Sequence, residues 1–173
     1  MRVSFCIPTH DGNARCQNYL FDIFHALSQQ TNKDFNVWIS DHSESNKVLD
    51  ACKEYADLFE INYIKNKKKY GNISANTNHA LQHADGSILK VLFSDDFILT
   101  NNLVAELDKA FNDDVHWAVT GYAHTVDDGH THYNPKIPYH NDKLLEGVNT
   151  LSSPSILALK RGIDMYFDED LTM

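Results

Sequence analysis

Residues 87–96 read SILKVLFSDD, an almost unbroken apolar run that ends in two adjacent carboxylates. Apolar side chains at nearly every position from 88 to 93 are typical of a strand covered on both faces, as in a parallel sheet between helices. Asp95 and Asp96 follow at the end of this strand. Because two neighbouring anions repel each other and resist burial, the stretch predicts a buried strand with a site for a positive partner beyond it.

Apolar periodicity predicts alternating strands and helices on both sides of this stretch. Strands are predicted at 3–7, 35–40, 61–64, 87–93 and 117–122, and amphipathic helices at 14–29, 48–59, 73–84 and 103–111. This alternation predicts an α/β fold with a mostly parallel, doubly wound sheet and right-handed crossovers. A further strand is expected at 155–161, and the polar, aperiodic residues 123–143 are expected to form a long loop or a hairpin.

Composition excludes several classes of protein. The 173 residues carry a formal net charge of -9, with a pI of about 5.4, so a nucleic-acid partner is not expected. No apolar run approaches the ~20 residues that a membrane-spanning helix needs, and the start of the chain lacks a signal-peptide apolar region. The three cysteines have no C-x-x-C spacing. We therefore expect one cytoplasmic domain with reduced core thiols.

Three polar segments follow predicted strands. They are Pro8-Thr9-His10-Asp11, Asp41-His42-Ser43 and Ser94-Asp95-Asp96. Ligands of doubly wound sheets bind beyond the carboxyl ends of the strands, so we expect these segments to share one crevice. The oxygens of Asp95 and Asp96 suit Mg²⁺ or Mn²⁺, which would in turn bind a diphosphate. Asp41 could accept a hydrogen bond from a nucleobase N–H or a ribose hydroxyl, and Lys69, in the basic run 65–69, could reach a phosphate or a uracil carbonyl.

The same carboxylates also have purely structural alternatives. One of the pair at 95–96 would suffice to cap the following turn, with Thr100 or Asn101 starting the next helix. Asp41 could cap a helix together with Ser43 or Ser45. The sequence before the first predicted helix is HDGNAR, without G-x-G-x-x-G, and no P-loop motif occurs anywhere, which disfavours a classical dinucleotide fold and a P-loop.

A histidine group in the polar segment also resembles a metal site. It contains His124, His130 and His132, with Asp127 and Asp128 between them. An H-x-H pattern in an acidic loop is more often incidental, so this group ranks below the Asp95-Asp96 pair as a metal site.

Six short motifs occur in a fixed order over essentially the whole chain. They are Ile7-Pro8-Thr9-His10, Gln30-Thr31 to Phe35, Asp41-His42-Ser43-Glu44-Ser45, Gly71 to Gly86 with Asn78, Leu92-Phe93-Ser94-Asp95-Asp96 and Phe167-Asp168-Glu169-Asp170-Leu171. Each motif is weak alone, and the ordered set resembles the inverting family 2 glycosyltransferases with the GT-A fold. The resemblance implies transfer of a sugar from a nucleotide-sugar donor, with a UDP-sugar favoured, to a glycan, lipid-linked or protein acceptor that the sequence does not name.

The resemblance also implies a role for individual residues. Thr9 and Asp41 would hold the uracil and ribose, Asp95 would contact the ribose or sugar, and Asp96 would bind the Mn²⁺ or Mg²⁺ ion that bridges the diphosphate. The other expected nucleotide-binding residues are Pro8, His10, Ser43, Lys69 and Asn78. In the full reaction, an Asp base would deprotonate the acceptor hydroxyl, which attacks the anomeric carbon with inversion.

Three departures from the family pattern stand out. Phe93 occupies the first acidic position of L-D-x-D-D, and Thr77 stands where an Arg often precedes the Asn. The family's general base is expected beyond Met173, so we expect the chain to be truncated before it, with Asp170 as the candidate base within the chain. Residues 1–122 are then the donor-binding half and residues 123–173 a partial acceptor-side region.

Two other functions remain as alternatives. One is a non-catalytic nucleotide-sugar-binding or interaction module that keeps the fold. The other is a nucleotidyltransferase on a similar sheet, which would need a Gly-rich basic loop after the first strand, and HDGNAR is a poor version of such a loop.

Overall fold

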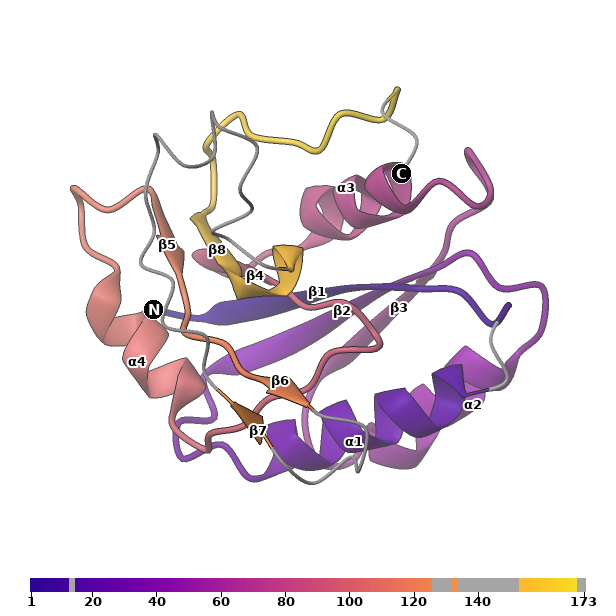
Figure 1. Cartoon of the computed structure of the whole chain (residues 1–173), viewed down its shortest axis with the longest axis horizontal. Helices are drawn as coiled ribbons and strands as arrows, with labels where there is room; N and C mark the ends of the chain where they lie inside the picture. Colours follow the sequence, from indigo (N-terminus) through magenta and orange to yellow (C-terminus); the bar gives the residue numbers. More distant parts are fainter. Residues whose placement is uncertain (13–14, 126–131, 134–152, 171–173) are drawn as a thin grey trace.

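Four parallel strands in the order β3-β2-β1-β4 form the larger part of a six-stranded sheet in the computed structural model (Figure 1). The structure describes residues 1–12, 15–125, 132–133 and 153–170. The strands are β1 (Val3–Thr9), β2 (Phe35–Asp41), β3 (Ile61–Lys65), β4 (Ile88–Val91), β5 (Trp117–Val119) and β8 (Leu157–Lys160). The helices are α1 (Cys16–Ser28), α2 (Lys47–Tyr55), α3 (Ile73–His83) and α4 (Leu103–Ala110), with a short 3-10 helix at Pro154–Ile156.

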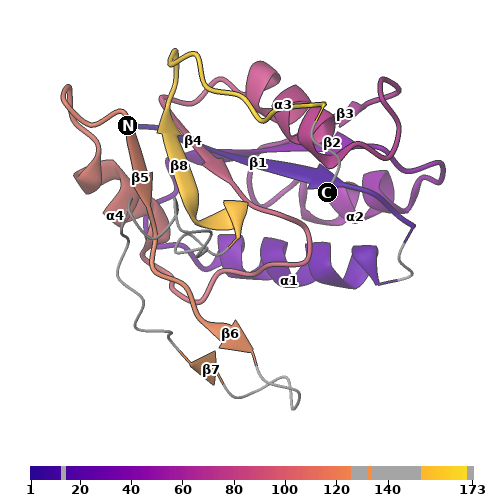
Figure 2. The ribbon, with the colours of Figure 1, turned by 45° about the horizontal axis from the view of Figure 1, so that its top comes forward.

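Helices cover both faces of the sheet. The side chains of α1, α2 and α4 join one apolar cluster with the strands, whereas α3 contributes Ala80 and Leu81 to a second cluster on the opposite face. Figure 2 shows α1 and α2 on one side of the strands and α3 on the other. The predicted α/β fold with a mostly parallel, doubly wound sheet is therefore confirmed.

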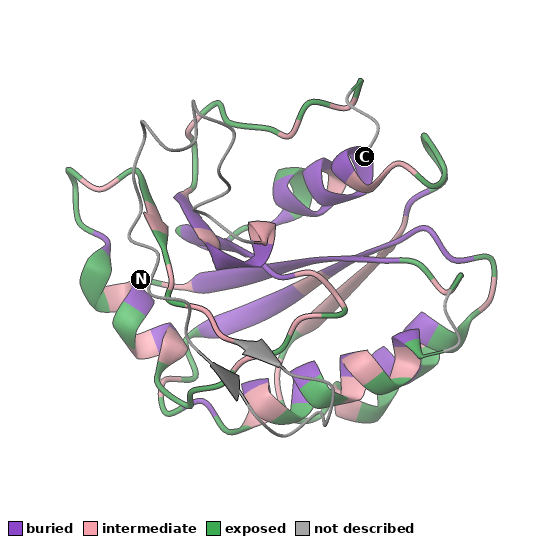
Figure 3. Cartoon of the chain, in the orientation of Figure 1, coloured by how far each residue is buried: buried purple, intermediate pink, exposed green. Residues whose placement is uncertain are grey.

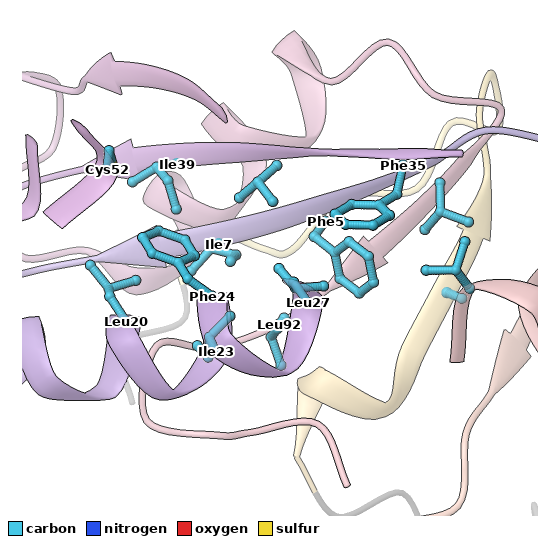
Figure 4. Close-up of a cluster of buried hydrophobic side chains, with 14 of the residues drawn as sticks. Phe5, Ile7, Leu20, Ile23, Phe24, Leu27, Phe35, Ile39, Cys52 and Leu92 are labelled. Atoms are coloured by element: carbon cyan, nitrogen blue, oxygen red, sulfur yellow. The ribbon is translucent and has the colours of Figure 1, made fainter. Parts of the chain in front are cut away.

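Burial explains why the chain adopts this arrangement. All seven residues of β1 are buried, and the helices turn their buried side chains toward the sheet and their exposed ones toward solvent (Figure 3). Figure 4 shows Leu20, Ile23, Phe24 and Leu27 of α1 directed at the strands. These four positions recur at the helical period, so one stripe of α1 supplies the apolar contacts with the sheet.

The position of β8 was not predicted. This strand lies between β4 and β5 and runs antiparallel to both, so β4 and β5 are not neighbours. Strand β4 is shorter than the predicted 87–93, and β5 is shorter than the predicted 117–122. A long polar segment separates β8 from β5 along the chain, and apolar periodicity carries no information about which earlier strand such a late strand joins.

Two further expectations concern the remaining segments. Within 123–143, β6 (His124–Thr125) pairs antiparallel with β7 (His132–Tyr133), in agreement with the hairpin alternative, while 126–131 and 134–143 lie outside the described residues. Cys6, Cys16 and Cys52 are buried free thiols. In the part of the chain that the structure describes, no helix has the length and apolar character needed to cross a bilayer.

Candidate functional site

The parallel strands β1, β2, β3 and β4 end at the same edge of the sheet, which is where the crevice is expected. In the parallel register, Thr9 at the end of β1 pairs with Asp41 at the end of β2, and Asp41 pairs with Lys65 at the end of β3. Strand β4 lies on the other side of β1, and Leu92 extends its pairing by donating to the Cys6 carbonyl at 3.1 Å. The chain thus turns to opposite sides of β1, which makes this edge the topological switch point where ligands of such sheets bind.

Asp41 is fully buried, and both oxygens of its carboxylate accept hydrogen bonds. The Ser43 backbone N–H donates to Oδ1 at 2.8 Å, and the Thr9 hydroxyl donates to the same atom at 3.2 Å. The Tyr63 hydroxyl and the Lys65 ammonium donate to Oδ2 at 2.6 and 3.1 Å. A carboxylate offers about four lone-pair sites, so Asp41 can accept a hydrogen bond from a nucleotide only if one of these donors moves.

Ser43 connects the loops that follow β1 and β2. Its hydroxyl accepts a hydrogen bond from the Asp11 backbone N–H at 2.8 Å. The Asp11 carboxylate accepts from the Ser45 hydroxyl and, at 3.3 Å, from the Ser45 backbone N–H. The Ser45 hydroxyl bond is the main cause that lowers the pKa of Asp11. The nucleotide-binding role expected for Ser43 stays a prediction, and its observed contact fixes the shape of the crevice wall.

An aromatic group lines the outer part of this edge. His10 Nε2 lies 3.0 Å from the Tyr70 hydroxyl, and the ring of Tyr70 is also next to His42, with centroids 6.0 Å apart. His42 donates from Nε2 to the Lys68 carbonyl at 3.0 Å, and burial lowers its pKa. His10 was a sequence-based candidate, His42 was expected only as part of the segment after β2, and Tyr70 was not predicted. Pro8 is buried within β1 and contributes to the strand.

The Asp95-Asp96 pair lies in a tight turn directly after β4. The Asp96 N–H donates to the Phe93 carbonyl at 3.1 Å, and the Ser153 hydroxyl donates to Asp96 Oδ2 at 2.8 Å. Asp95 is exposed and Asp96 is half-buried. Helix α4 begins only at Leu103, with Asn102 as its N-cap, so neither aspartate caps that helix.

Asp95 lies in the same acidic region as the carboxylates of the neighbouring loops. Burial is the main cause that raises the pKa of the Cys16 thiol at the start of α1. The negative charges of Asp41, Asp11 and Asp95 shift this pKa in the same direction. The charges of three carboxylates, each at or after the end of a different strand, thus all act on the start of α1.

Strand β4 contains a lysine, Lys90, shortly before the Asp95-Asp96 turn. This residue was not identified from the sequence as a site residue. Its side chain is 2% exposed, and its ammonium donates to the backbone carbonyls of Val91, at 3.1 Å, and Ser155. Burial lowers the pKa of Lys90 to about 7, while the negative charge of Asp96 acts in the opposite direction. The available signal was a single lysine inside the apolar run SILKVLF, where a charged side chain needs a specific partner.

A cavity of about 710 Å³ opens beside the Asp95-Asp96 turn, between the loop after β4, helix α4 and strand β5. Its lining includes the polar residues Lys90, Asp95, Asp96 and Ser153. Its lining also includes the apolar residues Leu92, Leu103, Leu107 and Ala118. A ligand that fills it would need an apolar part and a polar part that faces the carboxylates.

Two predicted nucleotide-binding residues, Lys69 and Asn78, contact the C-terminal segment instead of the crevice loops. The Lys69 ammonium pairs with Glu169 at 2.8 Å, and the Asn78 amide donates to the Phe167 carbonyl at 2.8 Å. Asp170 is exposed, and its backbone N–H donates to the Asp168 carboxylate at 2.9 Å. The structure thus brings these residues together at the start of α3, and their expected roles toward a nucleotide stay predictions.

The donor set after β4 fits a hard divalent cation. Asp95 and Asp96 supply carboxylate oxygens, which Mg²⁺ and Mn²⁺ prefer. No group of three or more His, Cys, Asp or Glu side chains with metal-site geometry occurs among the described residues. Mg²⁺ is commonly held by one or two carboxylates, with the other positions taken by water and substrate phosphates, so two aspartates are sufficient in principle. The histidine group at 124–132 lies largely outside the described residues.

Comparison with known proteins adds to this geometry. The profile of glycosyl transferase family 2 matches residues 4–165. No protein with a curated description matches significantly. The crystal structure of TarS 1-349 from S. aureus is 22% identical, with a TM-score of 0.53 over 64% of this chain and 31% of that chain. The mannosyltransferase PcManGT from Pyrobaculum calidifontis, in complex with GDP-Man and Mn²⁺, is 19% identical, with a TM-score of 0.54 over 67% of this chain and 34% of that chain.

These likenesses to solved structures show a shared fold, the GT-A fold. The chain spans about a third of the length of each of the two structures. The family profile covers nearly all of the chain, from the second residue of β1 to the segment after β8. The chain therefore belongs to glycosyl transferase family 2.

Proposed function

We propose that the chain forms the donor-binding part of a glycosyltransferase that moves a sugar from a nucleotide-sugar to an acceptor hydroxyl, with inversion and with help from Mn²⁺ or Mg²⁺. The observation that carries this proposal is the Asp95-Asp96 turn at the switch point of the sheet, next to the loops that follow Thr9 and Asp41. Family membership supports the same reaction class.

The roles of individual residues follow from their positions. The loops after β1 and β2, tied together by Ser43 and Asp11, would form the wall that receives the nucleoside. Asp95 is exposed and free to turn toward the ribose or sugar, while the Ser153 hydroxyl orients Asp96. Asp96 and Asp95 would hold the divalent cation, which, when bound, supplies positive charge to stabilise the departing nucleoside diphosphate. The ammonium of Lys90, when protonated, would stabilise the negative charge of Asp96.

We assign residues 1–122 to donor binding and residues 123–173 to a partial acceptor side. Asp170 is the candidate base within the chain, because it is exposed beside the start of α3, where Lys69 and Glu169 pair. A UDP-sugar is the favoured donor. One solved structure of TarS holds UDP-GlcNAc and that of PcManGT holds GDP-Man with Mn²⁺, so UDP and GDP are the first nucleotides to test.

Thermal denaturation with UDP, dTDP and GDP, each with and without Mn²⁺, tests donor binding. A ligand that binds only the folded chain adds about 2.7 kcal/mol at 100-fold excess over Kd, so the melting temperature should rise with one nucleotide when metal is present. Asp57→Asn changes an exposed aspartate away from the Asp95-Asp96 turn and serves as a control variant. Its melting temperature should still rise with nucleotide and metal. If no nucleotide stabilises the chain with metal present, the proposal is wrong.

Transfer is tested separately, by release of the nucleoside diphosphate from a panel of nucleotide-sugars with mixed acceptors. For the donor-binding part alone, we expect slow release that does not depend on the acceptor and is equal in the parent, Asp170→Asn and Asp168→Asn. Acceptor-dependent release that only Asp170→Asn removes would instead assign the base to Asp170, since loss of a general base costs about 10²–10⁴-fold in rate. Nucleotide binding without any release would favour the non-catalytic alternative.

A further inference from the structure

Two histidines lie one helical turn apart on α3. His79 is half-buried and His83 is exposed, and their ring centroids are 4.4 Å apart with an interplanar angle of 50°. Side chains at i and i+4 of a helix lie on the same face, so the rings are held next to each other by the backbone. The donor-binding proposal uses neither ring.

The hydrogen-bond network around His79 determines which of its nitrogens carries the proton. The Asn76 amide donates from Nδ2 to the Thr9 and Ser40 carbonyls at 3.0 Å each, which fixes Asn76 Oδ1 as the atom that faces the Ser40 hydroxyl. The Ser40 hydroxyl donates its single proton to this Oδ1 at 2.7 Å. Its 2.8 Å contact with His79 Nδ1 must then be donated by the ring. His79 therefore carries its proton on Nδ1 and a lone pair on Nε2.

His83 also carries its proton on Nδ1, as a single hydrogen bond indicates. Its Nδ1 lies 2.8 Å from the backbone carbonyl oxygen of His79. A carbonyl oxygen only accepts hydrogen bonds, so Nδ1 of His83 is the donor. The neutral ring then has its lone pair on Nε2. Both rings are thus in the tautomer in which Nε2 can bind a metal ion.

Burial lowers the pKa of His79, and the nearby His83, His42 and Lys68 shift it in the same direction when they are charged. A metal ion binds only to a neutral imidazole, so an environment that disfavours protonation also favours metal uptake.

We propose that Nε2 of His79 and Nε2 of His83 form a two-histidine site for a borderline transition-metal dication such as Zn²⁺, separate from the carboxylate pair after β4. Imidazole nitrogens select Zn²⁺, Ni²⁺ and Cu²⁺, whereas carboxylate oxygens select Mg²⁺ and Mn²⁺. Metal-binding histidines almost always donate their other ring N–H to a carbonyl, carboxylate or similar acceptor, and both Nδ1 atoms do so here.

A zinc ion at this pair would need further ligands besides the two histidines. Zn²⁺ lies about 2.0–2.1 Å from each histidine nitrogen and is usually four-coordinate. Among the described residues no third His, Cys, Asp or Glu completes the group, so water takes the other positions. With two protein ligands, the site is an accessory one of modest affinity, and it would hold the last turn of α3 in its helical form.

Zinc titration by calorimetry on the whole chain tests the site, with His83→Gln as the variant. His83 is exposed, so its replacement leaves the buried contacts of α3 intact. The chain has 10 histidines, and the informative quantity is the difference between variants. We expect His83→Gln to lose one zinc equivalent that the parent and His25→Gln retain. His25 is the matched control, because it is another exposed helical histidine, in the last turn of α1.

Excess Mg²⁺ should not displace this zinc ion, because Mg²⁺ prefers oxygen ligands. Equal zinc stoichiometry and affinity in the parent and His83→Gln would overturn the proposal. The tautomers are tested without metal, by nitrogen NMR of the ring atoms. Signals of a protonated Nε2 on both His79 and His83 at neutral pH would overturn the hydrogen-bond argument and the site with it.

Discussion

Asn78 holds the backbone of Phe167 by both of its polar groups. Its Nδ2 donates to the Phe167 carbonyl and its Oδ1 accepts from the Phe167 N–H, each at 2.8 Å. Nδ2 also reaches Glu169 Oε1 at 3.0 Å, and the other oxygen of Glu169 pairs with Lys69. The Asn72 side chain adds a bond to the Glu169 carbonyl at 2.8 Å. Helix α3 therefore fixes a segment that lies some 90 residues further along the chain.

We expect Asn78→Ala to lower the free energy of unfolding by about 1–3 kcal/mol, because it leaves the Phe167 N–H and C=O without their partners. Urea denaturation measures this loss, and limited proteolysis near 165–170 reports whether the segment is released. Gln82→Ala is the matched control, since Gln82 is exposed on the same helix. Equal free energies of unfolding for the two variants would show that the hydrogen bonds between Asn78 and the Phe167 backbone do not stabilise the chain.

A second prediction concerns the buried carboxylate of Asp41. Burial and the hydrogen bond to Asp41 raise the pKa of the Tyr63 hydroxyl, so this group remains a donor at all working pH values. Tyr63→Phe removes the 2.6 Å bond and should cost about 1.5–3 kcal/mol, the range for a hydrogen bond to a charged group. Tyr166→Phe, at an exposed tyrosine, should change the unfolding free energy little. A similar small effect of both variants would show that Asp41 does not depend on Tyr63.

The positions of residues at the ends of the strands were predictable. The run SILKVLF predicted a buried strand, and the carboxylates that follow it, together with Asp41, predicted the crevice edge. The position of β8 was not predictable from periodicity, because pairing between distant strands depends on tertiary packing. Gln30 illustrates a motif that the resemblance identified without a physical reason. The structure supplies one, since Gln30 donates to the Thr100 carbonyl at 2.7 Å and accepts from the Val104 N–H at 3.2 Å, which positions the start of α4.

Asn78 and Lys90 show where sequence reasoning falls short at the site itself. The resemblance implied a nucleotide-binding role for Asn78, which stays a prediction; the observed partner of its amide is 89 positions away, and no local pattern indicates it. Lys90 was visible as a charge within an apolar run, yet its partners are backbone carbonyls and a neighbouring carboxylate that only the folded chain brings together.

The third prediction uses the pH dependence of Lys90. In the folded chain the pKa of Lys90 is lowered to about 7, so between about pH 7 and pH 10.5 the unfolded chain binds one proton that the folded chain does not. The contribution of Lys90 is therefore most unfavourable below pH 7 and improves as the pH rises, by at most about 1.4 kcal/mol per pH unit.

Comparison of the parent with Lys90→Met isolates this effect. The stability of the parent relative to Lys90→Met should increase from pH 6 to pH 9.5, measured by urea denaturation with metal removed by a chelator. The pH dependence of other groups is common to both proteins and cancels in the difference between their free energies of unfolding. Loss of the two hydrogen bonds from Lys90 to backbone carbonyls changes the size of this difference, but the test uses only its change with pH. A difference that stays constant between these pH values would show that Lys90 titrates normally.

The last prediction separates the two aspartates after β4. Asp96→Asn keeps an acceptor for the Ser153 hydroxyl but removes the negative charge that favours the charged form of Lys90. Removing charge from this position also relieves repulsion from Asp95, but Asp95 is exposed and water screens its effect. The lost attraction to buried Lys90 should outweigh the relieved repulsion from Asp95. Without metal, Asp96→Asn should therefore lower the free energy of unfolding by about 1 kcal/mol at pH 6, where Lys90 is charged, and by less at pH 9.5.

Asp95→Asn is the matched control for this comparison, because it removes an identical charge from the exposed neighbour. It should leave the metal-free stability unchanged or slightly raised at both pH values. With Mn²⁺ and the stabilising nucleotide present, Asp96→Asn should lose the metal-dependent part of the rise in melting temperature, since an amide lacks the charge that a hard dication requires. If Asp96→Asn retains that rise, the cation is held elsewhere. If instead both variants lose equal stability without metal, Lys90 does not interact more strongly with Asp96 than with Asp95.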